Sequence, residues 1–290
     1  MLDILLLVLG ISGIIIASIT DIKTREVPDL LNYGMIISAS IIRLLDAIIN
    51  NSWPTLFYTA VSFIALFFIA NLMYYSKQWG GGDAKLLMAL SIIFATYPKN
   101  LLNYLNPNLD PFPFIMTLFI NILIIGSLYG LAYSVFLAIK NKDKLSKSYK
   151  KISAESNLKN LKFISFLLAI IVFLTLILLK INFSFISTIA ILFLLLYPYI
   201  LIFIKAVEAS SMYKMIDINK ITEGDWVAND LFINSKKIYS QSSPGITKQQ
   251  IQELRSNGIK SVLVKEGIPF VPSFLLATIF SLIIGNPLPI

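Results

Sequence analysis

Long apolar stretches separated by short polar connections dominate this chain. Seven of them reach the about 20 residues that a helix needs to cross a hydrocarbon core of about 30 Å, and these lie at 2–20, 31–49, 55–76, 112–138, 162–179, 183–204 and 268–285. An eighth stretch, Ala84 to Pro98, is shorter, but it can cross if the glycine turn before it lies at the membrane interface. The pattern therefore predicts an all-α polytopic membrane protein with about eight transmembrane helices.

The segment 206–267 breaks this pattern, because short apolar runs such as DWVANDLFI and KSVLVK alternate in it with a polar, helical stretch. Thr247 as N-cap, Gln250 three residues on and Gly258 after the last turn predict a helix over 248–257. We expect a small cytoplasmic α/β insert with a structural or docking role. The predicted domains are a membrane domain at 1–205 with seven spans, the insert at 206–267 and a C-terminal transmembrane helix at 268–290.

Lysines indicate the orientation of the spans. They gather in one connection, at Lys140, Lys142, Lys144, Lys147, Lys150, Lys151, Lys159 and Lys162. Short lysine-rich connections stay cytoplasmic, so eight crossings place 21–30, the glycine turn and the insert inside and both termini outside. The connections expected outside, 50–54, 99–111 and 180–182, then carry only Lys99 and Lys180. The first segment lacks a basic start and a cleavage site, so we expect it to be retained.

The amino-acid composition limits the reactions that this chain can catalyse. Hydrophobic residues make up 57% of the 290 positions and charged residues 14%, and the mean hydropathy is +0.78, values typical of an integral membrane protein. Because the chain has neither cysteine nor histidine, thiol nucleophiles, imidazole bases and zinc held by such ligands are excluded, and we expect no metal and no cofactor. The net charge of +8 follows the predicted cytoplasmic side, so the expected partner is the lipid bilayer, not nucleic acid.

Two carboxylates stand at equivalent membrane depth. Asp21 ends the first span, and Asp83 follows three glycines in the stretch WGGGDAKLL, so both fall at the predicted cytoplasmic interface. Charge in this position is costly and marks a functional site by default. Two close carboxyls share a proton, so that one activates water while the other protonates a carbonyl oxygen or leaving amine. The pattern predicts a dyad that can cleave a peptide bond without Ser, Cys, His or metal.

The residues around Asp83 allow two interpretations. Gly80, Gly81 and Gly82 remove side chains and permit unusual backbone angles, which would let a substrate backbone approach. They also fit a plain hinge at a helix start, with Asp83 as an N-terminal cap of the helix that follows. Lys85 can steady the Asp83 anion or contact the membrane surface.

Other polar residues carry weaker signals. Arg43 and Asp46 stand three residues apart on the second span, which predicts an intrahelical ion pair with a structural role. Serine–lysine catalysis would need Ser76 to face Lys77 or Lys85, and the spacing does not favour it.

The stretches DIKTREVPD and GGGDAK resemble the two aspartate motifs of the type IV prepilin peptidases, a family that shares the GxGD signature with presenilin. The stretch GIPFVPSFLLA also resembles the start of the last span in the archaeal prepilin and preflagellin peptidases. The resemblance implies an aspartic endopeptidase that removes the short basic leader from prepilin or archaellin precursors on the cytoplasmic side, with Asp21 and Asp83 as the catalytic pair. Gly80, Gly81, Gly82, Glu26, Asp29 and Lys85 are the candidates for contacting substrate. Members that also N-methylate carry CxxC pairs, which this chain lacks.

Two other functions compete with this one. In an ion-coupled secondary transporter, Asp21 and Asp83 would bind a cation and the glycines would break a helix, although such groups usually lie near the membrane midplane. In an assembly subunit of a pilus or secretion machine, the two aspartates would be structural.

Overall fold

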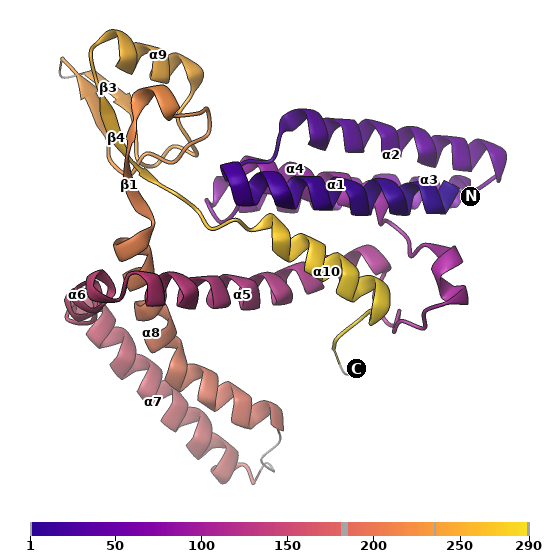
Figure 1. Ribbon diagram of the computed structural model, residues 1–290. Helices are drawn as coiled ribbons and strands as arrows, with labels where there is room; N and C mark the ends of the chain where they lie inside the picture. Colours follow the sequence, from indigo (N-terminus) through magenta and orange to yellow (C-terminus); the bar gives the residue numbers. More distant parts are fainter. Residues whose placement is uncertain (1, 181–184, 235, 289–290) are drawn as a thin grey trace. The chain divides into compact units, whose positions relative to one another are not determined.

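The computed structural model describes residues 2–180, 185–234 and 236–288 (Figure 1). Its helices are α1 (Leu2–Thr24), α2 (Asp29–Ile49), α3 (Trp53–Tyr75), α4 (Gly81–Ile93), η1 (Lys99–Asn103), α5 (Phe114–Lys140), α6 (Lys142–Ser153), α7 (Ser156–Leu178), α8 (Phe185–Ser211), η2 (Ile218–Lys220), α9 (Lys248–Ser256) and α10 (Val271–Ile283). Six of them, α1, α2, α3, α5, α7 and α8, are long and apolar enough to cross a membrane. The predicted all-α polytopic membrane fold is confirmed; the predicted start of a span at 183 lies outside the described residues.

The chain folds as two compact units. The first comprises residues 1–130 and 216–290, and the second comprises residues 131–215. In the first unit, α4 packs against α1, α2 and α3, and α1 also packs against α10. The side chains of Leu86, Leu87 and Leu90 on α4 are completely buried. This apolar helix therefore forms the centre of the first unit.

The helix α4 differs from the predicted span at 84–98. It begins three residues earlier, at Gly81, and ends at Ile93, so its 13 residues extend only about 20 Å at 1.5 Å per residue. The helix α10, predicted as a span at 268–285, is equally short. Burial between longer helices, not the length of its own apolar stretch, places α4 in the fold.

The outer faces of the long helices are apolar. Leu30 and Ile37 on α2 and Phe57 and Phe68 on α3 are exposed to 87, 60, 74 and 67%. Apolar surface on this scale is a liability in water, whereas in a bilayer it faces lipid tails. The exposed side chains thus agree with the chain being a multi-pass membrane protein.

In the second unit, part of the lysine-rich connection is itself helical. The helix α6 packs against α7 and α8, and its five lysines are exposed. Lys162 on α7 donates to Ser153 Oγ, at 2.8 Å, and its Nζ lies 5.3 Å from the centre of the Tyr199 ring. The hydrophobic pattern alone did not predict this helix, because it is short and has a polar composition.

The insert is a small α/β module within the first unit. The end of β1 (Tyr213–Asp217) pairs with β4 (Ser261–Lys265), and β2 (Leu231–Ile233) pairs antiparallel with β3 (Lys236–Tyr239). Its own core includes Tyr239, Leu254 and Val262.

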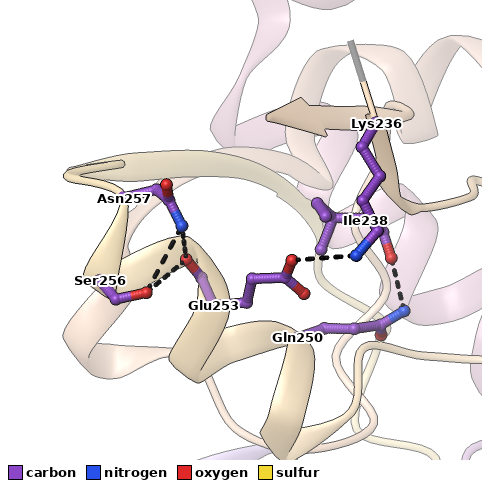
Figure 2. Close-up of polar contacts among 6 residues, drawn as sticks. All are labelled: Lys236, Ile238, Gln250, Glu253, Ser256 and Asn257. Atoms are coloured by element: carbon purple, nitrogen blue, oxygen red, sulfur yellow. Dashed lines mark hydrogen bonds and ion pairs between the residues drawn. The ribbon is translucent and has the colours of Figure 1, made fainter. Parts of the chain in front are cut away.

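The predicted helix of the insert is confirmed as α9. Thr247 is its N-cap and exchanges hydrogen bonds with Gln250, and Gly258 follows with a φ of 77°. Figure 2 shows how α9 is joined to β3. Gln250 donates to the main-chain oxygen of Ile238, at 2.7 Å, and the Nζ of Lys236 lies 3.5 Å from Glu253.

Candidate active site

Asp21 lies in the last turn of α1 and is only 5% exposed. Its Oδ2 accepts a hydrogen bond from the main-chain N–H of Val271, at 2.9 Å. Val271 is the first residue of α10, so the carboxylate receives one of the main-chain donors that a helix start leaves unpaired. The positive end of the helix dipole favours the charged carboxylate there.

Asp83 lies in the first turn of its own helix. Its Oδ2 accepts from the N–H of Gly80, the N-cap of α4, at 3.0 Å, which confirms the expected capping geometry. Oδ1 of Asp83 has no hydrogen-bond partner among the residues that the structure describes. A cap therefore occupies one oxygen of this carboxyl and leaves the other available for chemistry.

Packing of α1 against α4 sets the two carboxylates at one level. A Cβ added to Gly10 of α1 would lie 2.8 Å from the Phe94 ring, just beyond the end of α4. Asp21 follows Gly10 by eleven residues, and Asp83 precedes Phe94 by eleven residues, about 16 Å of helix in each case. The charge of Asp21 acts on the Asp83 carboxyl. The two carboxylates lie at one end of the first unit, which we call the aspartate end.

The three glycines fit the second interpretation, a helix start, since α4 begins at Gly81 with Gly80 as its N-cap. None of Gly80, Gly81 and Gly82 has a positive φ, so the expected unusual backbone angles are wrong. The space beside Gly82 is filled by the loop before α2, because an added Cβ would lie 3.0 Å from the Val27 Cβ and 3.2 Å from its main-chain nitrogen. The absence of a side chain at Gly82 thus lets the connection between α1 and α2 pack against Asp83's helix.

Lys85 does not contact Asp83. Its Nζ donates to Asp29, at 2.6 Å, and lies 5.3 Å from the centre of the Tyr33 ring. This ion pair joins the first residue of α2 to the second turn of α4. Since Asp29 has a cationic partner in the same chain, its charge is largely compensated.

The insert reaches the aspartate end at two points. Thr222 Oγ1 donates to the Glu26 carboxylate, and Lys77 Nζ donates to the main-chain oxygen of Gln241, at 2.6 Å. Burial raises the pKa of Asp225; the Thr222 N–H, which donates to it, lowers the pKa, and the Glu26 charge raises it again. Glu26 and Asp225 together therefore concentrate negative charge beside the site, and Asp225 was not among the residues expected here.

Arg43 and Asp46 do not form the predicted ion pair. Arg43 is only 3% exposed, and its guanidinium donates to the main-chain oxygens of Ile92 and Ile93, at 3.1 and 2.8 Å. Asp46 instead accepts from the side chains of Asn50 and Ser52. The unpaired carbonyls at the end of α4 attract the guanidinium, since a helix C-terminus favours cations.

Taken together, the fold and the site define a class: multi-pass helical membrane proteins with two acidic side chains brought together at one end of a helix bundle. The model of the type IV leader peptidase family matches residues 8–135, which include both aspartates. The preflagellin peptidase of Methanocaldococcus jannaschii is 33% identical over 90 residues, 31% of this chain and 38% of the relative. That of Methanococcus voltae is 28% identical over 99 residues, 34% of this chain and 42% of the relative.

Over residues 8–135 the chain thus resembles the type IV leader peptidase family. The matched stretches cover less than half the length of both curated relatives. Among solved structures, none matches the chain significantly.

Proposed function

We propose that this protein is an aspartic endopeptidase of the membrane that removes the short basic leader from prepilin or archaellin precursors. The observation that carries the proposal is the level pairing of Asp21 and Asp83, each held by a main-chain N–H at a helix start. The family match over residues 8–135 and the names of the two relatives support the same activity. The cut is proposed on the cytoplasmic side, ahead of the precursor's hydrophobic helix.

The two carboxyls would divide the chemistry between them. The ionised one takes a proton from water, which attacks the carbonyl carbon of the peptide bond, while the protonated one donates to the carbonyl oxygen. Collapse of the tetrahedral intermediate returns a proton to the leaving amine. The two helix starts favour the single negative charge of the pair, and such a pair titrates as a unit, so neither aspartate is assigned a fixed role.

The test is direct cleavage of precursors. Membranes containing the protein are incubated with prepilin and archaellin precursors, and the mass of each product gives the new N-terminus. We expect a single cut between the basic leader and the hydrophobic helix. Intact precursors in both reactions, with the peptidase shown to be folded, would refute the proposed activity.

The charge of the precursor's leader should control the rate of cleavage. Asp21, Asp83, Glu26 and Asp225 offer negative charge around the proposed cut, so replacing the basic residues next to the cut by Glu should slow cleavage about tenfold or more through repulsion near partly desolvated carboxylates. Added salt should reduce this difference, since it screens charges about 10 Å apart at 0.1 M. Replacements deep in the precursor's helix that keep it apolar serve as the matched control. Equal rates for basic and Glu-bearing leaders would contradict this account.

Orientation can be tested without substrate. We predict that a reporter fused after residue 150 lies in the cytoplasm, because the lysines of 140–162 act as an orientation signal. Replacing the exposed lysines of α6 by Gln should mix the orientations while leaving correctly inserted molecules active. A reporter found outside in the unmodified protein would overturn the proposed topology.

A further inference from the structure

The helix that carries Asp83 is held at both ends by one neighbour. At its start, Asn32 Nδ2 on α2 donates to the main-chain oxygen of Gly82, at 3.2 Å. At the end of α4, Arg43, which also lies on α2, donates to the main-chain oxygens of Ile92 and Ile93. Asn32 is completely buried and Arg43 nearly so. Both side chains therefore bind α4 through its main chain, whatever side chains α4 carries.

The spacing of these contacts is matched along the two helices. Asn32 and Arg43 stand eleven residues apart on α2, and Gly82 and Ile93 stand eleven residues apart on α4. Eleven residues make about three turns, so both contacts come from one face of α2. A slide of α4 by one turn, about 5.4 Å, would break both contacts at once.

The chemistry of the donors and acceptors favours the two contacts. A buried guanidinium is costly unless its donors are paired, and here three of its nitrogens donate, the third to Thr96 Oγ1 at 3.4 Å. Its partners are the carbonyls that a helix end leaves unpaired. The Gly82 oxygen can only accept, so it fixes which way the Asn32 amide points.

We propose that Asn32 and Arg43 are positioning residues that set the height of Asp83 against Asp21. The helix α4 is too short to span the bilayer, so the membrane's two surfaces do not fix its height, and α2 supplies the reference instead. The α2 helix is long enough to span. The proposal rests on the proposed function insofar as that height serves catalysis.

Kinetics tests the catalytic consequence. Arg43→Met and Asn32→Ala should each lower kcat by about 10²-fold, because a misplacement of about 1 Å can cost that much, while KM changes little. Arg43→Lys keeps donors for the same carbonyls and should recover most of the rate. The matched control is Asn71→Ala on α3, since Asn71 donates only within its own helix. Unchanged kcat in both variants, or an Arg43→Lys enzyme as slow as Arg43→Met, would overturn the proposal.

A second measurement is independent of cleavage. The chain has no cysteine, so Val27→Cys with Gly82→Cys introduces a single pair. The built Cβ at Gly82 lies 3.0 Å from the Val27 Cβ, so the displacement of a few tenths of an ångström that any Cβ at Gly82 causes brings the pair to the about 3.5–4.5 Å of a disulfide.

We expect the pair to oxidise readily with Arg43 present, and on the order of tenfold more slowly in Arg43→Met, because disulfide geometry tolerates little displacement. Equal oxidation rates would refute positioning even if the protein proves to cleave no precursor. Conversely, slowed oxidation in a protein that cleaves nothing would uphold positioning and refute only the proposed function.

Discussion

Asp21→Asn and Asp83→Asn should each leave the protein folded and inserted but lower cleavage by at least about 10³-fold, since each position must exchange a proton. An asparagine oxygen can still accept from Val271 or Gly80, so the two anchoring hydrogen bonds survive. The lost charge at a helix start costs only about 1 kcal/mol. The effect should thus fall on the reaction and not on the fold, and it is measured as the cleavage rate of a purified precursor.

The double variant sharpens this test. If the two carboxyls act as one unit, Asp21→Asn with Asp83→Asn should be no slower than either single variant. Asp143→Asn, at an exposed position of α6, is the matched control and should keep the full rate. Near-normal cleavage by either single variant would rule out the dyad. A loss of ion uptake in place of cleavage would instead identify a carrier.

The second large effect is expected at Gly82. An alanine Cβ there would lie 3.0 Å from the Val27 Cβ and 3.2 Å from its main-chain nitrogen, so the loop or the start of α4 must move by a few tenths of an ångström. This contact lies one residue from Asp83. We expect Gly82→Ala to lower kcat by about 10²-fold, because small displacements at a reacting centre cost that much.

Gly34 provides the control for this change. It lies on α2, and an added Cβ there would have nothing within 4 Å. Gly34→Ala should keep the full cleavage rate and stabilise the helix by up to about 1 kcal/mol. If Gly82→Ala were as active as Gly34→Ala, the tight packing of the loop on α4 would not matter for catalysis.

Local signals in the sequence were enough to predict much of this fold. The apolar stretches located the long helices, and Thr247 with Gln250 located α9, because these features act within a few residues. The bounds of α4 were wrong at both ends, since neighbours and an arginine from another helix decide where it ends. The lysine-rich helix α6 was missed because hydrophobicity does not mark it.

The two acidic residues of the candidate site could be singled out from the sequence, but the donors that bind them could not. Asp21 and Asp83 stood out because charge is rare in apolar sequence. Nothing in the sequence near Asp21 points to Val271, 250 positions away, as its donor. The predicted partner of Arg43, Asp46, was wrong for a similar reason. Asp46 is near in sequence, whereas Arg43 reaches the carbonyls of α4 only through tertiary packing. Long-range partners of this kind follow from the fold and not from spacing.

The bond between Asp21 and Val271 also has a consequence for biosynthesis. Asp21 is translated 250 residues before Val271, which follows all of α1 to α9 in the chain. During that interval the first carboxylate lacks its main-chain donor. We therefore expect the proposed cleavage activity to appear only once α10 has docked on α1, which would spare neighbouring nascent proteins at the same translocation site.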